Sequence, residues 1–429
     1  MHTTVSNAQH EDSDVSLRKR WFYLLPAVFV TYSLAYLDRA NFGFGAAAGL
    51  AATLKITGKQ TSLLGGLFFL GYFAFQLPGA SFARKRSARW LVFAALVSWG
   101  TFAALTGVIR VFWLLALDRL LLGVAESVIF PAMLVLLTRW FSRSERSRAN
   151  TFLILGNPVT VLWMSVVTGY LIDGFGWQTT FVIEGLPSIA WAVVWVIFVK
   201  DRPSDARWMS VEAAAKLEQV LAEEQVSVAG GVDAVRQALM RPDVLMLSGL
   251  YFFWSLGVYG FVFWLPTMVR RGSELSMART GLVAAVPYGV AVVGMLVVSY
   301  VSDRTGRRDL LVWPCLLLGG AALMGSFLFA ERSFAAAFAC LVLGGACMYA
   351  PYGPFFAIVP ERLPRSVTAE VLAMINSAGA LGGFVGSYFV GWLGEVTGDS
   401  RAGYLLMSVA LVLAGLMMLG LPQTARRTA

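Results

Sequence analysis

Residues 111–138 read VFWLLALDRLLLGVAESVIFPAMLVLLT. Apolar side chains fill most of this run, which exceeds the roughly 20 residues that cross the hydrocarbon core of a bilayer as a helix. Because a backbone in lipid must satisfy its own hydrogen bonds, we expect a membrane helix here. Asp118, Arg119 and Glu126 interrupt the run, and a charge inside a membrane is costly unless it faces a cavity or a partner.

Similar runs fill the rest of the chain. Hydrophobic residues make up 58% of the 429 residues and charged residues only 14%, against roughly 25% charged in a soluble domain. We therefore expect an all-α membrane protein with twelve transmembrane helices in two six-helix halves. The expected helices are residues 21–48, 61–83, 89–109, 111–138, 149–173, 178–199, 242–269, 278–302, 309–330, 333–359, 366–393 and 401–422.

The polar segments divide the chain into five parts. These are a disordered cytoplasmic tail (1–20), a first half (21–199), a cytoplasmic linker (200–241), a second half (242–422) and a short cytoplasmic tail (423–429). In the linker, residues 211–224 favour a short surface helix. Loops on the side of the two termini hold 24 Lys and Arg, and loops on the other side hold 8. This asymmetry predicts that both termini are cytoplasmic.

Several function classes are excluded by composition. The net charge of +9 is spread over helix ends, so we expect no nucleic-acid partner. The three Cys lie in apolar runs, and both His lie in the N-terminal tail, so we expect no metal site, no cofactor and no enzyme. The chain has no Walker loop, which indicates transport driven by a gradient.

Five charged residues lie within two of the predicted helices: Asp38 and Arg39 in the first, and Asp118, Arg119 and Glu126 in the fourth. Arg119 and Glu126 are seven residues apart and share one helix face. Protonating Asp38 and Glu126 would leave two arginines that attract an anion, so proton uptake and anion binding favour each other. We expect Asp118 to be structural. The alternative for the other four is a set of ion pairs that only holds helices together.

The loop after the eighth helix resembles the signature of the major facilitator superfamily. Asp303, Arg304, Gly306, Arg307 and Arg308 match that pattern. We expect Asp303, Arg304 and Arg307 to brace a cytoplasmic gate. The first-half copy departs from the pattern, since Arg84 stands where an acid is usual and Ser87 replaces the glycine. The pattern therefore gives no support for a charge latch on that side.

Within that superfamily the chain resembles the anion:cation symporters, which include sugar-acid permeases. The matching stretches are 36–41, the run from Arg119 through Glu126 to Pro131, 176–187 and 263–266. The resemblance implies an arginine pair for the substrate carboxylate, which here is Arg39 and Arg119. It also implies proton uptake by Asp38 and Glu126. Polar side chains at four positions are implied to touch the substrate: Tyr36, Tyr72, Asn157 and Asn376.

Local signals refine this site. Asn157 precedes Pro158, and we expect a helix break there whose freed backbone groups face the ligand. The second half offers only neutral side chains at mid-depth, with Tyr259 as its substrate-binding tyrosine. The other neutral side chains are Tyr251, Tyr288, Tyr349, Tyr352 and Asn376. Ordinary packing is the alternative for each tyrosine.

These observations predict a proton-coupled symporter that imports a small organic anion by alternating access. A sugar acid is the first expectation, and an aromatic acid or other monocarboxylate is the second. A sodium-coupled or efflux carrier stays open, as does a membrane sensor that binds the anion without transport. We expect a monomer in the bilayer of the bacterial cytoplasmic membrane.

Overall fold

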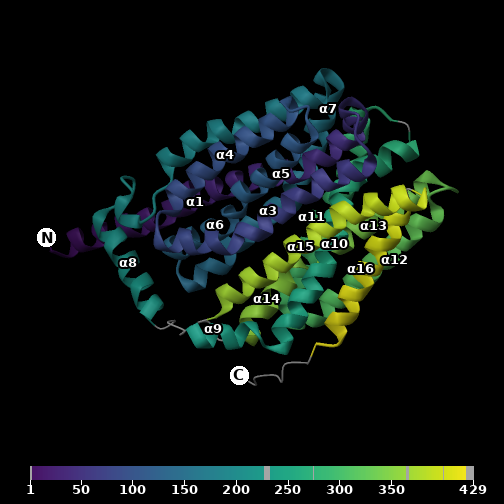
Figure 1. Cartoon of the computed structure of the whole chain (residues 1–429). Helices are drawn as coiled ribbons and strands as arrows, with labels where there is room; N and C mark the ends of the chain where they lie inside the picture. Colours follow the sequence, from purple (N-terminus) through teal and green to yellow (C-terminus); the bar gives the residue numbers. More distant parts are fainter. Residues whose placement is uncertain (1, 227–231, 274, 364–366, 400, 422–429) are drawn as a thin grey trace.

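The computed structural model describes residues 2–226, 232–273, 275–363, 367–399 and 401–421, and these residues form helices without strands. Figure 1 shows two groups of helices lying side by side and connected through α8 and α9. The first group comprises α1 (His2–Ala47), α2 (Leu50–Leu54), α3 (Gly58–Lys85), α4 (Ala88–Val108), α5 (Phe112–Ser127), α6 (Ile129–Trp140) and α7 (Arg143–Phe198).

The connection and the second group follow in chain order. The connection holds η1 (Pro203–Asp205), α8 (Val211–Val226) and α9 (Val232–Leu239). The second group holds α10 (Pro242–Ser273), α11 (Met277–Thr305), α12 (Asp309–Phe329), α13 (Phe334–Tyr349), α14 (Tyr352–Arg362), α15 (Thr368–Thr397) and α16 (Ala402–Leu419). The short helix expected at 211–224 is therefore present as α8.

Helices of membrane-spanning length dominate both groups. In the described part of the chain, nine helical stretches are long and apolar enough to cross a bilayer, with α5–α6, α13–α14 and the long α7 each taken as one. Large apolar side chains on their outer faces are exposed, for example Trp113, Val193 and Leu296. Exposed apolar surface of this extent suits contact with lipid rather than water.

Two predicted helices are broken in the middle. The run 111–138 divides into α5 and α6 at Val128, and the run 333–359 divides into α13 and α14 at Ala350 and Pro351. Proline explains both breaks, since Pro131 and Pro351 have no N–H to donate to the carbonyl four residues earlier. The breaks occupy the fourth segment of each group, which supports a relation between the two halves.

The long α7 folds back on itself at Gly176. This glycine has φ 77° and ψ 161°, outside the helical region. Thr168 nevertheless donates a hydrogen bond to Glu184, and a straight helix would hold these residues about 24 Å apart. The two arms of α7 therefore lie against each other. The expected break at Asn157–Pro158 is wrong, because the helix continues through both residues.

The N-terminal tail also differs from expectation. Residues 2–20 are helical and continue without interruption into the first membrane segment, so α1 begins at His2. The tail contains no glycine or proline. Adding a turn to an existing helix avoids the cost of nucleation, so the membrane segment can extend into the tail.

The two groups meet along three helix pairs: α1 with α10, α3 with α15, and α7 with α11. Glycine makes the first contact close, since a Cβ atom on Gly43 would lie 2.3 Å from the carbonyl oxygen of Phe263. The start of α1, the end of α16 and the connecting helices α8 and α9 lie at one end of the bundle (Figure 1). We call it the linker end, and the opposite end the distal end.

Candidate functional site

A buried ion pair lies within the first group. Arg39 of α1 donates from Nε to Oε2 of Glu126 on α5 at 3.0 Å. Both side chains are almost wholly buried. The guanidinium also lies over the ring of Tyr72, 4.5 Å from its centroid. One nitrogen of Arg39 (Nη2) and one oxygen of Glu126 (Oε1) have no hydrogen-bond partner. The pair therefore has unused capacity to bind a ligand or a proton.

Arg39 also lines a small cavity between the two groups. The cavity has a volume of about 30 Å³, roughly the space of one water molecule. Its walls contain six of the candidate residues named from the sequence: Arg39, Tyr72, Asn157, Tyr251, Tyr259 and Asn376. The other wall residues were not predicted to contact a substrate, because no local pattern distinguishes them from packing residues: Tyr32, Phe69, Gly379 and Ala380.

Two predicted binding residues lie outside these walls. Arg119 is 2% exposed, and its guanidinium lies 4.3 Å from the ring centroid of Phe42 and 5.5 Å from that of Phe68. Its Nε has no hydrogen-bond partner. Tyr36 is equally buried, with its ring 5.5 Å from the guanidinium carbon of Arg39. Tyr36 thus lies beside Arg39, which lines the cavity, whereas Arg119 lies against two phenylalanine rings.

Asp38 and Arg39 are consecutive in α1, and Asp38 has a different set of partners. Oδ1 of Asp38 accepts a hydrogen bond of 3.5 Å from the Asn41 amide, and Oδ2 has no partner. The same amide nitrogen donates to Oε2 of Glu184 at 3.0 Å. Sequence reasoning missed Glu184, although a single acid in the apolar run 178–199 could have indicated it.

Asp118 is held within the first group. Its Oδ2 accepts a hydrogen bond of 2.8 Å from the hydroxyl of Thr106 on α4. With Asp118 and Glu184 included, four buried carboxyl groups accompany Arg39 and Arg119. The sequence predicted that two acids and two arginines cancel in charge. That prediction is incomplete, because four buried acids accompany these two arginines.

Most tyrosines predicted in the second group pack against one another. Tyr349 stacks with Tyr352 at 5.7 Å, and Tyr288 meets Tyr349 edge-on at 5.9 Å. These three residues lie outside the cavity walls, whereas Tyr251 and Tyr259 line them. The second group thus contributes aromatic and amide surface to the cavity.

Polar contacts between the groups gather at the distal end. Asp173 of α7 accepts hydrogen bonds of 2.9 Å from the backbone N–H groups of Met277 and Ala278, which begin α11. Arg270 of α10 donates to the carbonyl of Ala47 in α1. A carboxylate at a helix N-terminus is a favourable arrangement. These contacts hold the two groups together at this end.

A family model described as the Major Facilitator Superfamily matches residues 28–387, and again residues 274–428. The chain belongs to the major facilitator superfamily. It is accordingly a transporter rather than an enzyme, and the predicted all-α fold is confirmed.

Relatives of this major facilitator protein include named anion carriers. The chain is 30% identical over 415 residues to a putative tartrate transporter of Agrobacterium vitis, covering 95% of this chain and 92% of that protein. It is also 30% identical over 410 residues to a quinolone resistance transporter of Acinetobacter baumannii, covering 92% of each.

A solved structure shares the fold. A bacterial homolog of the human lysosomal transporter Spinster, in an inward-facing and occupied conformation, superposes with a TM-score of 0.74 at 18% identity. The match covers 93% of this chain and 96% of that chain.

The superfamily signature loop follows α11. Asp303 lies 3.8 Å from Arg308, which forms a second ion pair of 2.7 Å with Glu361 of α14. Arg304 lies over the ring of Tyr300 at 4.7 Å, and the backbone N–H of Arg307 donates to Thr305. Arg308 and Glu361, rather than the predicted Arg304 and Arg307, thus connect this loop to α14.

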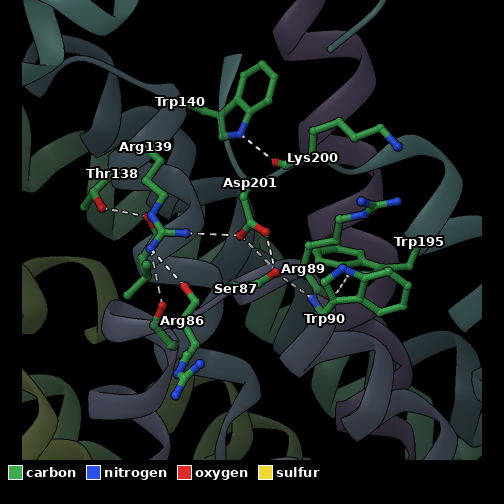
Figure 2. A network of polar contacts seen from close by, with 12 residues as sticks. Arg86, Ser87, Arg89, Trp90, Thr138, Arg139, Trp140, Trp195, Lys200 and Asp201 are labelled. Atoms are coloured by element: carbon green, nitrogen blue, oxygen red, sulfur yellow. Dashed lines mark hydrogen bonds and ion pairs between the residues drawn. The ribbon is translucent and has the colours of Figure 1, made fainter. Parts of the chain in front are cut away.

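In the first half, the loop that corresponds to the signature (Arg84 to Ser87) has no acid of its own. Asp201, which is distant in the sequence, lies beside this loop instead. Figure 2 shows Asp201, just after α7, surrounded by Ser87, Arg89 and Arg139. Ser87 donates its hydroxyl to Asp201, and the N–H of Arg89 donates at 3.2 Å. Arg139 forms an ion pair of 3.1 Å with the same carboxylate. A charge latch therefore exists in the first half although the sequence there departs from the signature pattern, and it joins α4, α6 and the linker.

Proposed function

We propose that this transporter is a proton-coupled symporter that imports a small organic anion by alternating access. One observation carries the proposal: Arg39 both lines the cavity between the groups and pairs with buried Glu126. A single guanidinium is therefore available to either an internal carboxylate or a ligand carboxylate.

Competition for Arg39 supplies the coupling. When Glu126 is ionised, its carboxylate occupies Nε of Arg39. When Glu126 binds a proton, its negative charge disappears and the guanidinium can bind a carboxylate ligand through two parallel hydrogen bonds. Proton binding then strengthens anion binding, and anion binding strengthens proton binding by the same factor.

Asp38 is the second proposed proton site. Two protons with one monovalent anion would carry one net positive charge inward, and the membrane potential would then contribute about 2.3 kcal/mol per 100 mV. Arg119 supplies a further buried positive charge beside the site, within electrostatic reach of Asp38 and Glu126. In this scheme Arg119 binds the ligand after the aromatic residues over it move.

The neutral walls favour a hydroxylated anion. Tyr72 and Asn157 come from the first group, and Tyr259 and Asn376 come from the second. Phenol and amide groups donate and accept hydrogen bonds, as the hydroxyl groups of a sugar acid require. The relative named as a putative tartrate transporter supports this substrate class, because tartrate is a short sugar diacid.

Alternating access requires the two helix groups to open at one end of the bundle while they are closed at the other. The distal end is closed by the contacts of Asp173 and Arg270. The cavity of about 30 Å³ is too small for a sugar acid, so binding requires the groups to move apart. We propose that the linker end, with both termini, faces the cytoplasm of a bacterium, and that the groups rock about the cavity.

Efflux is the second candidate function. The relative named as a quinolone resistance transporter is as similar to this chain as the putative tartrate transporter. The aromatic residues of the cavity wall would suit a ring-bearing substrate. In this case the same proton exchange at Glu126 would drive export by antiport.

Uptake into proteoliposomes tests the proposal. Purified protein is first screened by thermal shift against tartrate, D-gluconate, D-galacturonate and benzoate. We then expect the stabilising anion to accumulate under an inward proton gradient, to stop accumulating with a protonophore, and to ignore sodium. Accumulation that requires sodium, or that occurs only under a gradient of opposite direction, would contradict proton-coupled import.

A further inference from the structure

Glu184 lies on the second arm of α7 in a buried polar cluster that the cavity does not include. Its Oε2 accepts a hydrogen bond of 3.0 Å from the amide of Asn41 on α1, and its Oε1 accepts from the hydroxyl of Thr168 on the first arm of α7. Asn41 also donates to Asp38, at 3.5 Å. One amide nitrogen thus joins two carboxyl groups. All four side chains are at least nine-tenths buried.

Among the residues that the structure describes, Glu184 has no ion-pair partner. Its hydrogen-bond donors, Asn41 and Thr168, are both uncharged. From α1, the ionisable group that faces it is Asp38, which is also acidic. The packed helix α4 has one ionisable residue, Arg89, and this guanidinium is bound at the linker end to the carbonyl of Val196.

Among the side chains that the structure describes, the other elements packed against α7 bring no cation to Glu184. Arg139 of α6 forms an ion pair with Asp201 at the linker end. On α11, the ionisable residues lie near the two helix ends, apart from Tyr288 and Tyr300, which carry no positive charge. On α7 itself, Asp173 is bound to the start of α11. A buried carboxylate without a cation is costly, and binding a proton removes that cost.

Two acceptor atoms in this cluster have no partner. These are Oδ2 of Asp38 and Oδ1 of Asn41. Two ionised carboxylates and an amide oxygen offer more acceptors than the amide and the hydroxyl can supply with hydrogens. One added proton, bound to a carboxyl oxygen, becomes a donor and removes one negative charge. The cluster is thus one hydrogen short of a satisfied network.

We propose that Asp38, Asn41 and Glu184 form a proton-binding site, separate from the substrate cavity, in which the two carboxyl groups share one proton. This inference rests on the proposed function and deepens it, since it makes Glu184 a partner of the coupling residue Asp38. The proton comes from water and returns to water, forming and breaking one O–H bond on a carboxyl oxygen.

The site can communicate with the cavity through Asp38. This carboxyl group is repelled by Glu126 and Glu184 and attracted by Arg119. Its chain neighbour Arg39 lines the cavity. Loading the proton removes the repulsion between Asp38 and Glu184 and weakens the attraction of Asp38 for Arg119. The guanidinium of Arg119 is then more available to an anion.

Infrared difference spectroscopy of the full-length protein in nanodiscs tests the proposal without any substrate. The carboxyl C=O absorption is followed as a function of pH in wild type, Glu184→Gln, Thr168→Val and Asp118→Asn. In Glu184→Gln the repulsion that Glu184 exerts on Asp38 is lost, so we expect the midpoint of the Asp38 carboxyl to move down by about one pH unit or more. In Thr168→Val the ionised form of Glu184 loses a donor, so the midpoint should move up.

The two opposite shifts separate a proton site from a loss of folding. Asp118→Asn is the matched control, because Asp118 is a buried acid with a threonine donor outside the cluster, and it should leave the midpoint unchanged. Wild-type midpoints in both Glu184→Gln and Thr168→Val would overturn the proposal. A midpoint that moves when sodium chloride replaces choline chloride would also overturn it and assign the cluster to a metal cation. Neither result depends on transport, so failure here is distinct from failure of the proposed function.

Discussion

Arg39 and Glu126 form a buried ion pair of 3.0 Å between α1 and α5, and the guanidinium of the same arginine lines the cavity between the two halves. Breaking a buried pair by removing one partner is strongly destabilising because an uncompensated charge remains. Neutralising the carboxylate with a proton while an anion arrives avoids that penalty. The pair therefore suits exchange between two carboxylates better than a permanent structural role.

Arg119→Ala should abolish anion binding. Arg119 supplies the second positive charge of the buried set, and without it a single guanidinium has to neutralise the ligand and the acids. The thermal shift produced by the stabilising anion should disappear, which corresponds to at least a tenfold loss of affinity, or about 1.4 kcal/mol. Arg110→Ala is the control, since Arg110 is exposed and bonds the carbonyl of Gly107. An unchanged shift in Arg119→Ala would remove Arg119 from the site.

Asp173→Ala should open the distal end. The carboxylate of Asp173 accepts the first N–H groups of α11 and so joins the two halves. A cysteine introduced at Thr267, which lines a cavity of about 410 Å³ beside Arg270, should react faster with a water-soluble maleimide when Asp173 is removed. The comparison is made in a background that lacks the three native cysteines. Equal labelling rates with and without Asp173 would show that this contact does not close the distal end.

Asp201→Asn should destabilise the linker end of the first half. The substitution removes the ion pair with Arg139 and weakens the hydrogen bonds from Ser87 and Arg89 (Figure 2). Loss of bonds to a charged acceptor costs about 1–3 kcal/mol, so thermal unfolding in detergent should begin at a lower temperature. Asp205→Asn, at an exposed position in η1, should leave the unfolding curve unchanged. Identical curves for the two variants would contradict a bracing role for Asp201.

Gly176→Ala should destabilise the fold-back of α7. Gly176 has φ 77° and ψ 161°, a combination that residues with a side chain adopt at a cost of about 1–3 kcal/mol. Gly174→Ala is the matched control, because Gly174 has no positive φ and open space around its Cβ position. We expect a lower unfolding temperature for Gly176→Ala alone. A drop of equal size in both variants would mean that conformational strain at Gly176 is not the cause.

Hydropathy predicted the helical segments because each apolar run has to hydrogen-bond its own backbone in lipid. It could not place the breaks beside Pro131 and Pro351, since proline is also tolerated inside membrane helices, as Pro158 shows. The tail was predicted as disordered from its polarity, although nothing in residues 2–20 stops helix propagation.

Charges in apolar runs correctly indicated Asp38, Arg39, Arg119 and Glu126 as buried residues. The same rule applied to Glu184 would have identified the fourth buried acid. Its hydrogen bonds with Asn41 and Thr168 could not be predicted from the sequence, because they depend on how the arms of α7 fold and how α1 packs against them. For the same reason Asp201 could not be recognised as the acid that serves the loop at Ser87.

Glu126→Gln tests the central claim most directly, in proteoliposomes that carry the stabilising anion. The glutamine mimics the protonated carboxyl and cannot release a proton, so Arg39 stays available to the ligand. We expect counterflow of labelled anion to persist while accumulation driven by an inward proton gradient is lost. Full accumulation by Glu126→Gln under the same gradient would show that Glu126 carries no coupling proton and would contradict the account.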